Sequence, residues 1–380
     1  MKRNFLFTIV LLTMTICVHS QEIIRNSLRL PEEIFGYKVL KCDFHLHTVF
    51  SDGMVWPVIR IAEAIAEGLD AIAISDHIEA RPIMRSIGIE NLSHSLGYDL
   101  AQSAATAAGV ILIPAVEITK EAPPGHFNAL FIQDANKFET TYNHQNPRDG
   151  SYTRTALKEA RDQNAFIFWN HPWYQIPDAL SIWHPIIDSL YNEGFIDGIE
   201  VVNGTKYDPV ILDWVQQKSL TNIANSDLHT PTVFGSDRYR TMTIVFAKER
   251  SAEGIREALE NRRTVSHVEG VLIGDKKYLE EIFQQSIEIS ATCDGNNNGV
   301  LVLKNNSSMR YDMKFVDTDG LRFASYTGGV TAPPNGETAV VVTNTSGFGN
   351  RRSYQIKITI MNLEIEPETP LETTLEMIFK

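Results

Sequence analysis

The sequence predicts an α/β protein in which a barrel of parallel strands precedes a small antiparallel β-sandwich. Apolar runs alternate with helical patterns between about residues 39 and 268, which is typical of a parallel α/β architecture. From residue 286 onward, short β-rich runs are divided by Asn, Gly, Pro and Ser, which is typical of a sandwich. We therefore expect a barrel over residues 21–273, a connecting helix over 274–285 and a β-rich domain over 286–380.

The first twenty residues have the layout of a cleaved signal peptide. Lys2 and Arg3 precede an apolar run, and small residues end the segment at Ser20. We expect residues 1–20 to be removed and the mature chain to be periplasmic or secreted. The alternative is a membrane anchor, but the run is shorter than the roughly 20 apolar residues that a membrane-spanning helix needs. A stable anchor is therefore not expected.

Charge and cysteine content restrict the partners. The formal net charge is −13 and no block of Lys or Arg is present, which argues against a nucleic acid duplex or an anionic membrane surface as the partner. A small anionic substrate stays open if bound cations reverse the local sign of the charge. After removal of the leader, Cys42 and Cys293 remain far apart in sequence, so a disulfide framework is not expected.

The elements of the predicted barrel follow from the local patterns. Helical spacing of apolar residues predicts helices over 57–68, 97–109 and 152–163, the first ending at Gly68. Apolar runs predict strands over 40–45, 69–77, 110–118, 126–132, 165–171, 196–204 and 220–229. Seven strands, mostly with helices between them, favour a closed barrel as the simplest arrangement.

Polar side chains cluster where these apolar runs end. His45 and His47 alternate in the strand "KCDFHLH" and so share one face. Further polar residues at run ends are Asp76, His77, Glu117, His171, Asp227 and His229. In a parallel barrel the carboxyl ends of the strands form the active site. Helix capping is the alternative, and it suits Asp76 and Asp227 but not the histidines, which are poor caps.

Imidazoles and carboxylates together favour a metal centre with more than one ion. The candidate ligands are His45, His47, Asp52, His77, Glu117, His126, His171, Asp227 and His229. This mixture suits zinc, manganese or iron, whereas calcium prefers oxygen ligands and structural zinc usually involves cysteine. A single histidine on a strand is more often structural, but nine ligands together exceed the needs of one ion. The pattern predicts two to three divalent ions.

Six motifs in order resemble those of the PHP (polymerase and histidinol phosphatase) superfamily of metal-dependent phosphoesterases. They are "FHLHTVFSDG", "ISDH", "AVEIT", "GHFNAL", "WNHP" and "NSDLH", and the likeness covers residues 38 to 268. It implies a distorted (β/α)7 barrel and a trinuclear metal centre. The signal peptide and the β-rich tail are similar to an exported branch of the Sb-PDE type, which hydrolyses organophosphate diesters.

The resemblance also implies how the ligands divide among three ions. The first ion would have His45, His47, Glu117 and Asp227. The second would share Glu117 as a bridge and add His126 and His171. The third would have Asp52, His77 and His229, where many family members have histidine in place of Asp52. Glu117 and Asp227 would then be catalytic as shared ligands, and a hydroxide bridging two ions would attack the phosphoryl group.

Substrate contacts are predicted from residues next to the motifs. "FGSDRYR" places Arg238 and Arg240 shortly after His229, so either could bind phosphate in a bidentate manner, with an exposed loop arginine as the alternative. Arg81, Lys120 and Tyr174 are further candidates. Scattered cations and the aromatic motif "WNHPWY" favour a phosphodiester over a phosphomonoester. A phosphomonoesterase and an inactive metal-binding or ligand-binding protein remain the alternatives.

Overall fold

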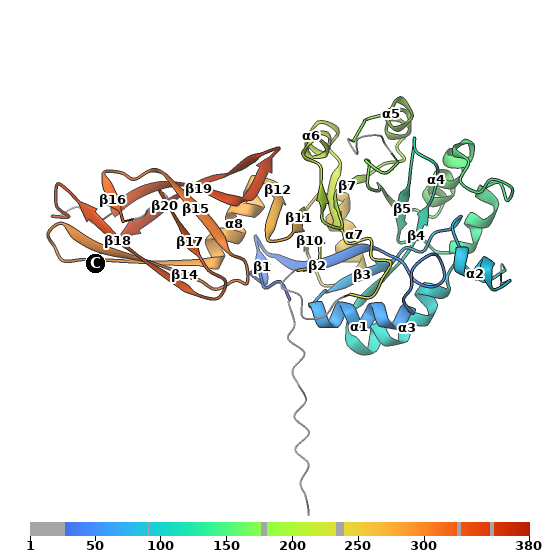
Figure 1. Cartoon of the computed structure of the whole chain (residues 1–380), viewed down its shortest axis with the longest axis horizontal. Coiled ribbons are helices and arrows are strands. Elements are labelled where there is room, and N and C mark those ends of the chain that lie inside the picture. The colour runs from blue at the N-terminus through green and yellow to red at the C-terminus, as the bar shows by residue number, and fades with distance from the viewer. Residues whose placement is uncertain (1–26, 90, 176–180, 233–238, 325–327, 350–352) are drawn as a thin grey trace, which may run out of the picture.

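The computed structural model describes residues 27–89, 91–175, 181–232, 239–324, 328–349 and 353–380. The expected signal peptide, residues 1–20, lies outside this range. No helix within the described residues is long and apolar enough to cross a bilayer. Figure 1 shows an elongated molecule, with an α/β part at one end and an antiparallel β part at the other.

The α/β part contains the elements that carry the predicted ligands. Its strands are β1 (Glu33–Ile34), β2 (Tyr37–Leu46), β3 (Ala71–Ile74), β4 (Ile111–Ile118), β5 (Phe127–Leu130), β6 (Phe166–Trp169), β7 (Gly198–Asn203), β8 (Lys206–Tyr207), β9 (Thr221–Asn225), β10 (Met242–Ala247), β11 (Thr264–Val268) and β12 (Val271–Gly274). Its helices are α1 (Pro57–Glu67), α2 (Pro82–Ser86), α3 (Leu96–Ala108), α4 (Thr153–Asp162), α5 (Pro185–Asn192), α6 (Pro209–Lys218) and α7 (Ala252–Glu260), with the 3-10 turns η1 (Ala135–Thr141) and η2 (Gly150–Tyr152).

The strands form one mixed sheet in the order β12-β11-β10-β2-β3-β4-β5-β6-β7, with β8 and β9 both paired to β7. β2, β3 and β4 are parallel, as are β6, β7 and β9. The expectation of a parallel sheet is wrong for β5, which pairs antiparallel with β4 and β6, and for β10 against β2. Residues 119–126 between β4 and β5 contain no helix, and such a short connection suits an antiparallel pair.

The first and last parallel strands approach each other through individual contacts. A single bridge joins Leu46, at the end of β2, to Leu228, just after β9. On the other side, the hydroxyl of Thr243 on β10 accepts a hydrogen bond from the amide of Ala224 at 2.9 Å and donates one to its carbonyl at 2.8 Å. These contacts bring the carboxyl ends of β2, β3, β4, β6, β7 and β9 to one rim of the α/β part.

The helices cover this sheet with their apolar faces. On α1, Ile61 and Ala64 are buried, and the helix ends at Gly68, whose left-handed backbone (φ 68°) lets its amide reach the last carbonyls. The predicted stop at Gly68 is therefore correct. The helices predicted over 97–109 and 152–163 correspond to α3 and α4.

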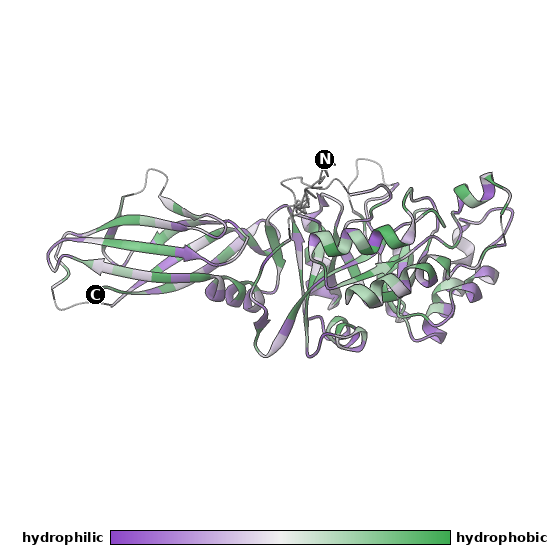
Figure 2. Ribbon diagram, turned by 90° about the horizontal axis from the view of Figure 1, so that it is seen from below, coloured by the Kyte–Doolittle hydropathy of each residue, from purple (hydrophilic) through white to green (hydrophobic). Residues whose placement is uncertain are grey.

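The antiparallel part begins with helix α8 (Lys276–Ser286), close to the predicted connecting helix. It continues with β13 (Ile287–Cys293), β14 (Asn298–Asn305), β15 (Tyr311–Asp317), β16 (Leu321–Phe323), β17 (Gly329–Ala332), β18 (Glu337–Asn344), β19 (Ser353–Glu366) and β20 (Thr369–Ile378). One sheet has the order β13-β14-β18-β16, and the other contains β17, β15, β19 and β20. Buried and exposed residues alternate along β14 and β18, and the C-terminal strands show alternating hydropathy in Figure 2.

Candidate metal centre

The carboxyl end of β2 supplies the first pair of ligand candidates. His45 and His47 are fully buried, and their Nε2 atoms both lie 3.3 Å from Oε2 of Glu117. Oδ1 of Asp227 lies 3.3 Å from Nε2 of His45 and 3.1 Å from Nε2 of His47. Ligand atoms about 2.0 to 2.1 Å from a tetrahedral ion are separated by roughly 3.3 Å. These four side chains therefore surround a space of the size that one ion needs.

Glu117, at the end of β4, lies between this first set and a second. Its other oxygen, Oε1, is 2.8 Å from Nδ1 of His126 and 3.6 Å from Nε2 of His171. His126 directly precedes β5, and because β5 runs antiparallel to β4, His126 lies at the rim beside Glu117. Glu117 can therefore reach two ions through different oxygens, as a bridging ligand must.

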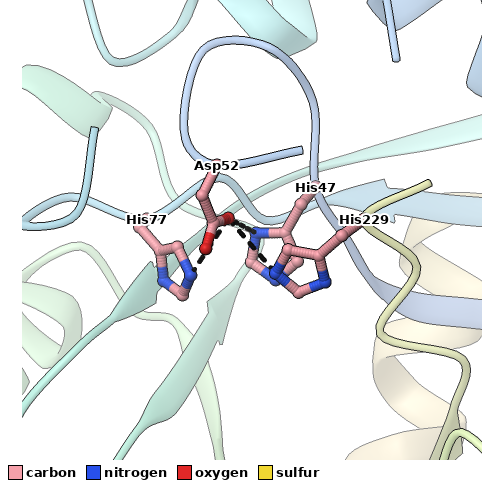
Figure 3. Close-up of side chains that lie close together, drawn as sticks. All are labelled: His47, Asp52, His77 and His229. Carbon is pink, nitrogen blue, oxygen red and sulfur yellow. Dashed lines mark ion pairs between the residues drawn. The ribbon is translucent and has the colours of Figure 1, made fainter. Parts of the chain in front are cut away.

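Asp52 stands in the loop after β2 and forms the third set. Its Oδ1 lies 3.4 Å from Nε2 of His77 and 3.2 Å from Nε2 of His229, and 3.8 Å from Nδ1 of His47. Figure 3 shows the carboxylate of Asp52 between the rings of these three histidines. Asp52 and His229 are about one third exposed, whereas His45, His47 and Glu117 are fully buried, so the centre opens to solvent on this side.

The nine predicted ligands therefore lie together, although their grouping differs in part from the expected one. The side chains whose ligand atoms lie within 4.8 Å of one another form four groups, namely His47, Asp52, His77 and His229; His45, His171 and Glu200; His45, His47 and Glu117; and His77, Glu117 and His126. His171 is grouped with His45 and not with His126. His45, His47, His77 and Glu117 each belong to two groups, which suits neighbouring ions that share a ligand shell.

Two of these residues have unusual backbone conformations. His171 has φ 25° and Asp227 has φ 52°, both in the left-handed region that side chains other than glycine rarely adopt. Each follows a strand end, β6 for His171 and β9 for Asp227. Strain of this kind is often found where a side chain must point into a functional site, and here Nε2 of His171 lies 3.6 Å from Oε1 of Glu117 and 3.9 Å from Oδ2 of Asp227.

Glu200 on β7 is the residue of the site that the sequence did not single out. Its Oε1 is 2.8 Å from Nδ1 of His45 and accepts a hydrogen bond from Asn225, while Oε2 accepts from the amide of His171 and from Asn203. These partners occupy both oxygens, so Glu200 orients His45 and His171. The signal in the sequence was a glutamate inside the apolar run "IDGIEVV".

Other hydrogen bonds fix the loop and the remaining ligands. The carboxylate of Asp76, the residue before His77, accepts hydrogen bonds from Thr48 and Ser51. Ser51 in turn lies 3.3 Å from Nδ1 of His47. Asp76 therefore positions the loop that carries Asp52, and reaches His47 through one intervening hydroxyl.

The electrostatics of the site favour bound positive charge. Burial opposes protonation of His45 and His77, but Asp227, Glu200 and Glu117 raise the pKa of His45, and Glu117 and Asp52 raise that of His77. Burial would likewise raise the pKa of Glu117, yet the surrounding histidines hold it well below its ordinary value. Several carboxylates in one buried space thus attract cations, and divalent ions would supply the charge that protons otherwise bring.

Unpaired atoms test whether a metal suits these residues. Buried polar atoms nearly always have a hydrogen-bond partner. Seven buried side-chain atoms of the site have none among the described residues: Nε2 of His45, His47 and His126, Nδ1 of His171, Oδ1 of Asp52 and Asp227, and Oε2 of Glu117. All seven are lone-pair donors of the kind that zinc, manganese or iron binds, so the donor set fits divalent ions.

The structure describes only one of the two arginines that the sequence predicts to bind phosphate. Arg238 lies outside the described residues. Arg240 is buried, and its guanidinium is 3.1 Å from Asp43, 3.8 Å from Glu63 and 2.5 Å from Glu67. Because these carboxylates and the hydroxyl of Thr232 engage its nitrogens, the arrangement disfavours Arg240 as a phosphate ligand.

Comparisons with known proteins agree with the geometry. No protein-family model and no curated protein matches the chain. A solved structure from Bacteroides vulgatus, described as a two-domain protein containing a predicted PHP-like metal-dependent phosphoesterase, is 36% identical, with a TM-score of 0.82. The match covers 93% of this chain and 98% of that one.

A second solved structure, from Bifidobacterium adolescentis and described as a candidate metal-dependent phosphoesterase, is 16% identical, with a TM-score of 0.41. The match covers 57% of this chain and 95% of that one. We draw no conclusion from a TM-score this low. The Bacteroides match extends over both parts of the molecule at a level of identity that indicates common descent. The chain therefore belongs to the PHP-like metal-dependent phosphoesterases.

Proposed function

We propose that the protein is an exported phosphodiesterase that uses two to three divalent ions, zinc or manganese, with iron as a further candidate. The observation that carries this proposal is the gathering of four buried, unpaired ligand atoms, on His45, His47, Glu117 and Asp227, at histidine-to-carboxylate distances of 3.1 to 3.3 Å. Family membership supports hydrolysis of a phosphate ester. The proposal includes a closed (β/α)7 barrel, domain limits at about residues 273 and 286, and removal of residues 1–20.

Each residue of this centre would have its own role in holding or orienting the ions. His45, His47 and Asp227 would hold one ion, and Glu117 would link it to a second near His126 and His171. Bound divalent ions neutralise the phosphoryl oxygens and lower the pKa of water, so no serine or cysteine nucleophile is needed. Glu200 keeps Nε2 of His45 directed inward by engaging Nδ1 of the same ring. The ester would enter on the solvent side, beside Asp52 and His229.

Aromatic surface next to the ligands supports a diester substrate. The ring of Tyr174 lies 4.8 Å from that of His126 and 5.1 Å from that of His171, and the residue is 40% exposed. It can contact an organic ester group. Trp173, beside it, lies under the ammonium of Lys206. A diester carries two organic groups and one negative charge, and so gains more from such a surface than a monoester does.

The test is a substrate panel with metal analysis on the purified mature protein. We expect kcat/KM to be higher for bis-aryl or alkyl-aryl phosphates than for the aryl monophosphate, and activity to be lost to a chelator and restored by zinc or manganese. Glu117→Gln and Asp227→Asn should each abolish turnover, because each removes a charged ligand, while folding persists. A tenfold preference for the monoester would establish the phosphomonoesterase alternative. Absence of turnover in metal-loaded protein would favour the binding protein.

The number of ions is tested through Asp52. Because Asp52 contacts His77 and His229 but lies apart from Glu117, Asp52→Ala should remove about one ion per chain and leave the two-ion minimum of a shared centre. Elemental analysis of the variant and the wild type gives the difference. An unchanged metal content would remove Asp52 from the ligands.

A further inference from the structure

Arg60 of helix α1 is fully buried next to the metal centre, and the proposed chemistry gives it no role. A guanidinium carries five N–H donors in a fixed plane and keeps its charge at any ordinary pH. Burying such a group is unfavourable unless its donors find partners. The groups that accept the hydrogen bonds of Arg60 therefore indicate what this side chain does.

All five donors of Arg60 are engaged. Nε and Nη2 both donate to the carbonyl of His47, at 3.0 and 2.9 Å. Nη2 also donates to the carbonyl of Leu228 at 2.7 Å, and Nη1 donates to that of Thr230 at 3.1 Å. The other proton of Nη1 goes to the carboxylate of Glu63 at 2.7 Å. Four of the five bonds thus end on backbone carbonyls.

These carbonyls belong to the two segments that carry His47 and His229. Leu228 and Thr230 stand immediately before and after His229, so Arg60 holds the chain on both sides of that ligand. Both histidines belong to the group that also contains Asp52. The backbone adds one bond between the segments, from the amide of His47 to the carbonyl of Leu228 at 3.1 Å. Arg60 is therefore bonded to both segments and links them.

The segment around His229 has little regular structure to fix it. Residues 226–232, all of which the structure describes, contain one bridge, between Leu228 and Leu46, but no helix or strand. The side chain of His229 is 36% exposed, so packing restrains it less than the buried ligands. A metal site requires its ligands to be held within about 0.5 Å of the productive geometry. The bonds from Arg60 supply this restraint on the backbone.

Glu63 holds Arg60 in place and binds the same segment. Its Oε2 accepts from Nη1 of Arg60, while its Oε1 accepts from the amide of Thr232 at 2.8 Å. Glu63 is also fully buried, and it stands three residues after Arg60, so both side chains lie on one face of α1. The helix therefore presents a charge-paired donor and acceptor to residues 228–232.

We propose that Arg60 is a positioning residue for the third ion, and that its four bonds to backbone carbonyls hold His47 and His229 at the spacing that an ion beside Asp52 requires. The inference rests on the proposed function, because it takes divalent ions to bind at this centre. Arg60 itself contacts neither ion nor substrate. None of its five bonds goes to His45 or Glu117, so its loss should affect the third ion first.

The test is metal binding by Arg60→Lys. Lysine keeps the positive charge next to Glu63, but its ammonium is a compact donor that cannot reach three separate carbonyls in the manner of a guanidinium. In manganese-loaded protein, elemental analysis gives the number of ions and competition with a chelator gives their affinities. We expect Arg60→Lys to weaken the third ion by about 10-fold to 100-fold and to leave two ions bound.

Arg263→Lys is the matched control. Arg263 is also buried, at 8% exposed, and its Nε donates to the carbonyl of Phe246 at 2.9 Å while its Nη2 pairs with Glu257. Phe246 lies on β10, which carries none of the candidate ligands. Arg263→Lys should therefore lower stability but leave all three ions bound. Thermal midpoints of the metal-free proteins record the loss of stability in both variants, so a selective loss of one ion is distinguished from general destabilisation.

Three ions of wild-type affinity in Arg60→Lys would overturn the inference. Equal weakening of all ions would also overturn it, because it would indicate only general destabilisation. A wild type that binds two ions would do the same, since no third ion would need positioning. If Arg60→Lys does not fold, Glu63→Gln decides the question. It removes one of the two acceptors shared by Arg60 and Thr232, and unchanged affinity for the third ion would contradict the proposal.

These measurements need no substrate. If no phosphate ester is hydrolysed, the proposed function fails, and the metal titrations still decide whether Arg60 positions the third ion.

Discussion

At the residue scale, Glu200 shows how the metal ligands acquire their orientation. It is fully buried and its two oxygens engage four donors, on His45, His171, Asn203 and Asn225. A histidine that binds a metal through one nitrogen usually donates from the other to such a carboxylate. Glu200 thereby fixes which nitrogen of His45 faces Glu117 and Asp227.

We expect Glu200→Gln to weaken metal binding by about 10-fold to 100-fold while the protein stays folded. Glutamine keeps one acceptor oxygen but turns an amide NH2 toward two donors, so either His45 or the backbone of His171 loses its partner. Competition with a chelator measures the affinity. Glu193→Gln, on an exposed helix end, is the control. Wild-type affinity in Glu200→Gln would mean that Glu200 does not orient His45.

Sequence position indicated most of the candidate ligands that gather at the rim, but not the residues around them. Seven of the nine candidates stand at or just after the end of an apolar run, whereas Asp52 lies in the loop beyond β2 and His126 directly precedes β5. The rim of the sheet brings all nine together. Glu200 stands at a similar place, yet a lone glutamate in a strand has no spacing that distinguishes it. The engagement of Arg240 by Asp43, Glu63 and Glu67 depends on contacts between distant segments, which no local pattern encodes.

At the element scale, the approach of α3 to β3 controls the loop that carries Asp52. A Cβ on Gly97 would lie 2.4 Å from Oδ2 of Asp76 and 2.9 Å from the side chain of Ile74. Asp76 holds Thr48 and Ser51 through hydrogen bonds of 2.6 to 2.7 Å. Only glycine at this position of the helix lets Asp76 keep those contacts.

We expect Gly97→Ala to destabilise folding by about 1 to 3 kcal/mol through overpacking, although alanine is the better helix former by about 1 kcal/mol. Displacement of Asp76 should also loosen the Asp52 loop and lower the occupancy of the third ion. Denaturant unfolding and elemental analysis measure the two effects. Gly150→Ala is the control, because its Cβ would make only ordinary van der Waals contacts, the nearest with Pro124 at 3.7 Å. A stabilised Gly97→Ala protein would contradict this packing.

The sequence predicted where the strands lie better than it predicted the direction in which they run. The apolar run of β5 is as regular as those of its neighbours, so its pattern gave no sign that it runs antiparallel. The short connection after β4 was the available signal, since a parallel crossover requires a dozen or more residues. This reversal matters for function, because it brings His126 back beside Glu117.

At the scale of the whole molecule, the two parts share a continuous core. One hydrophobic cluster contains Ile244 and Phe246 of the α/β part, Phe283 of α8, and Tyr311 and Ile356 of the antiparallel part. β12 also pairs in parallel with β19, through Leu272 with Leu363 and Ile273 with Glu364. Figure 1 shows α8 and β12 at this junction. The sequence predicted a separate sandwich, because nothing local indicates that β19 extends the large sheet.

We expect the two parts to unfold together because of this junction. Leu363 is fully buried in the shared cluster, so Leu363→Ala should lower the free energy of unfolding by about 2 to 5 kcal/mol and shift a single thermal transition of the whole chain. Ile378→Ala, at a residue that is 56% exposed, should shift it little. Metal content and kcat should not change, since Leu363 contacts none of the ligands. The measurement combines calorimetry with tryptophan fluorescence. The fluorescence reports on the α/β part, because that part contains all five tryptophans. Two separated transitions, with the fluorescence transition unmoved by Leu363→Ala, would show that the antiparallel part folds independently and is not needed to stabilise the catalytic rim.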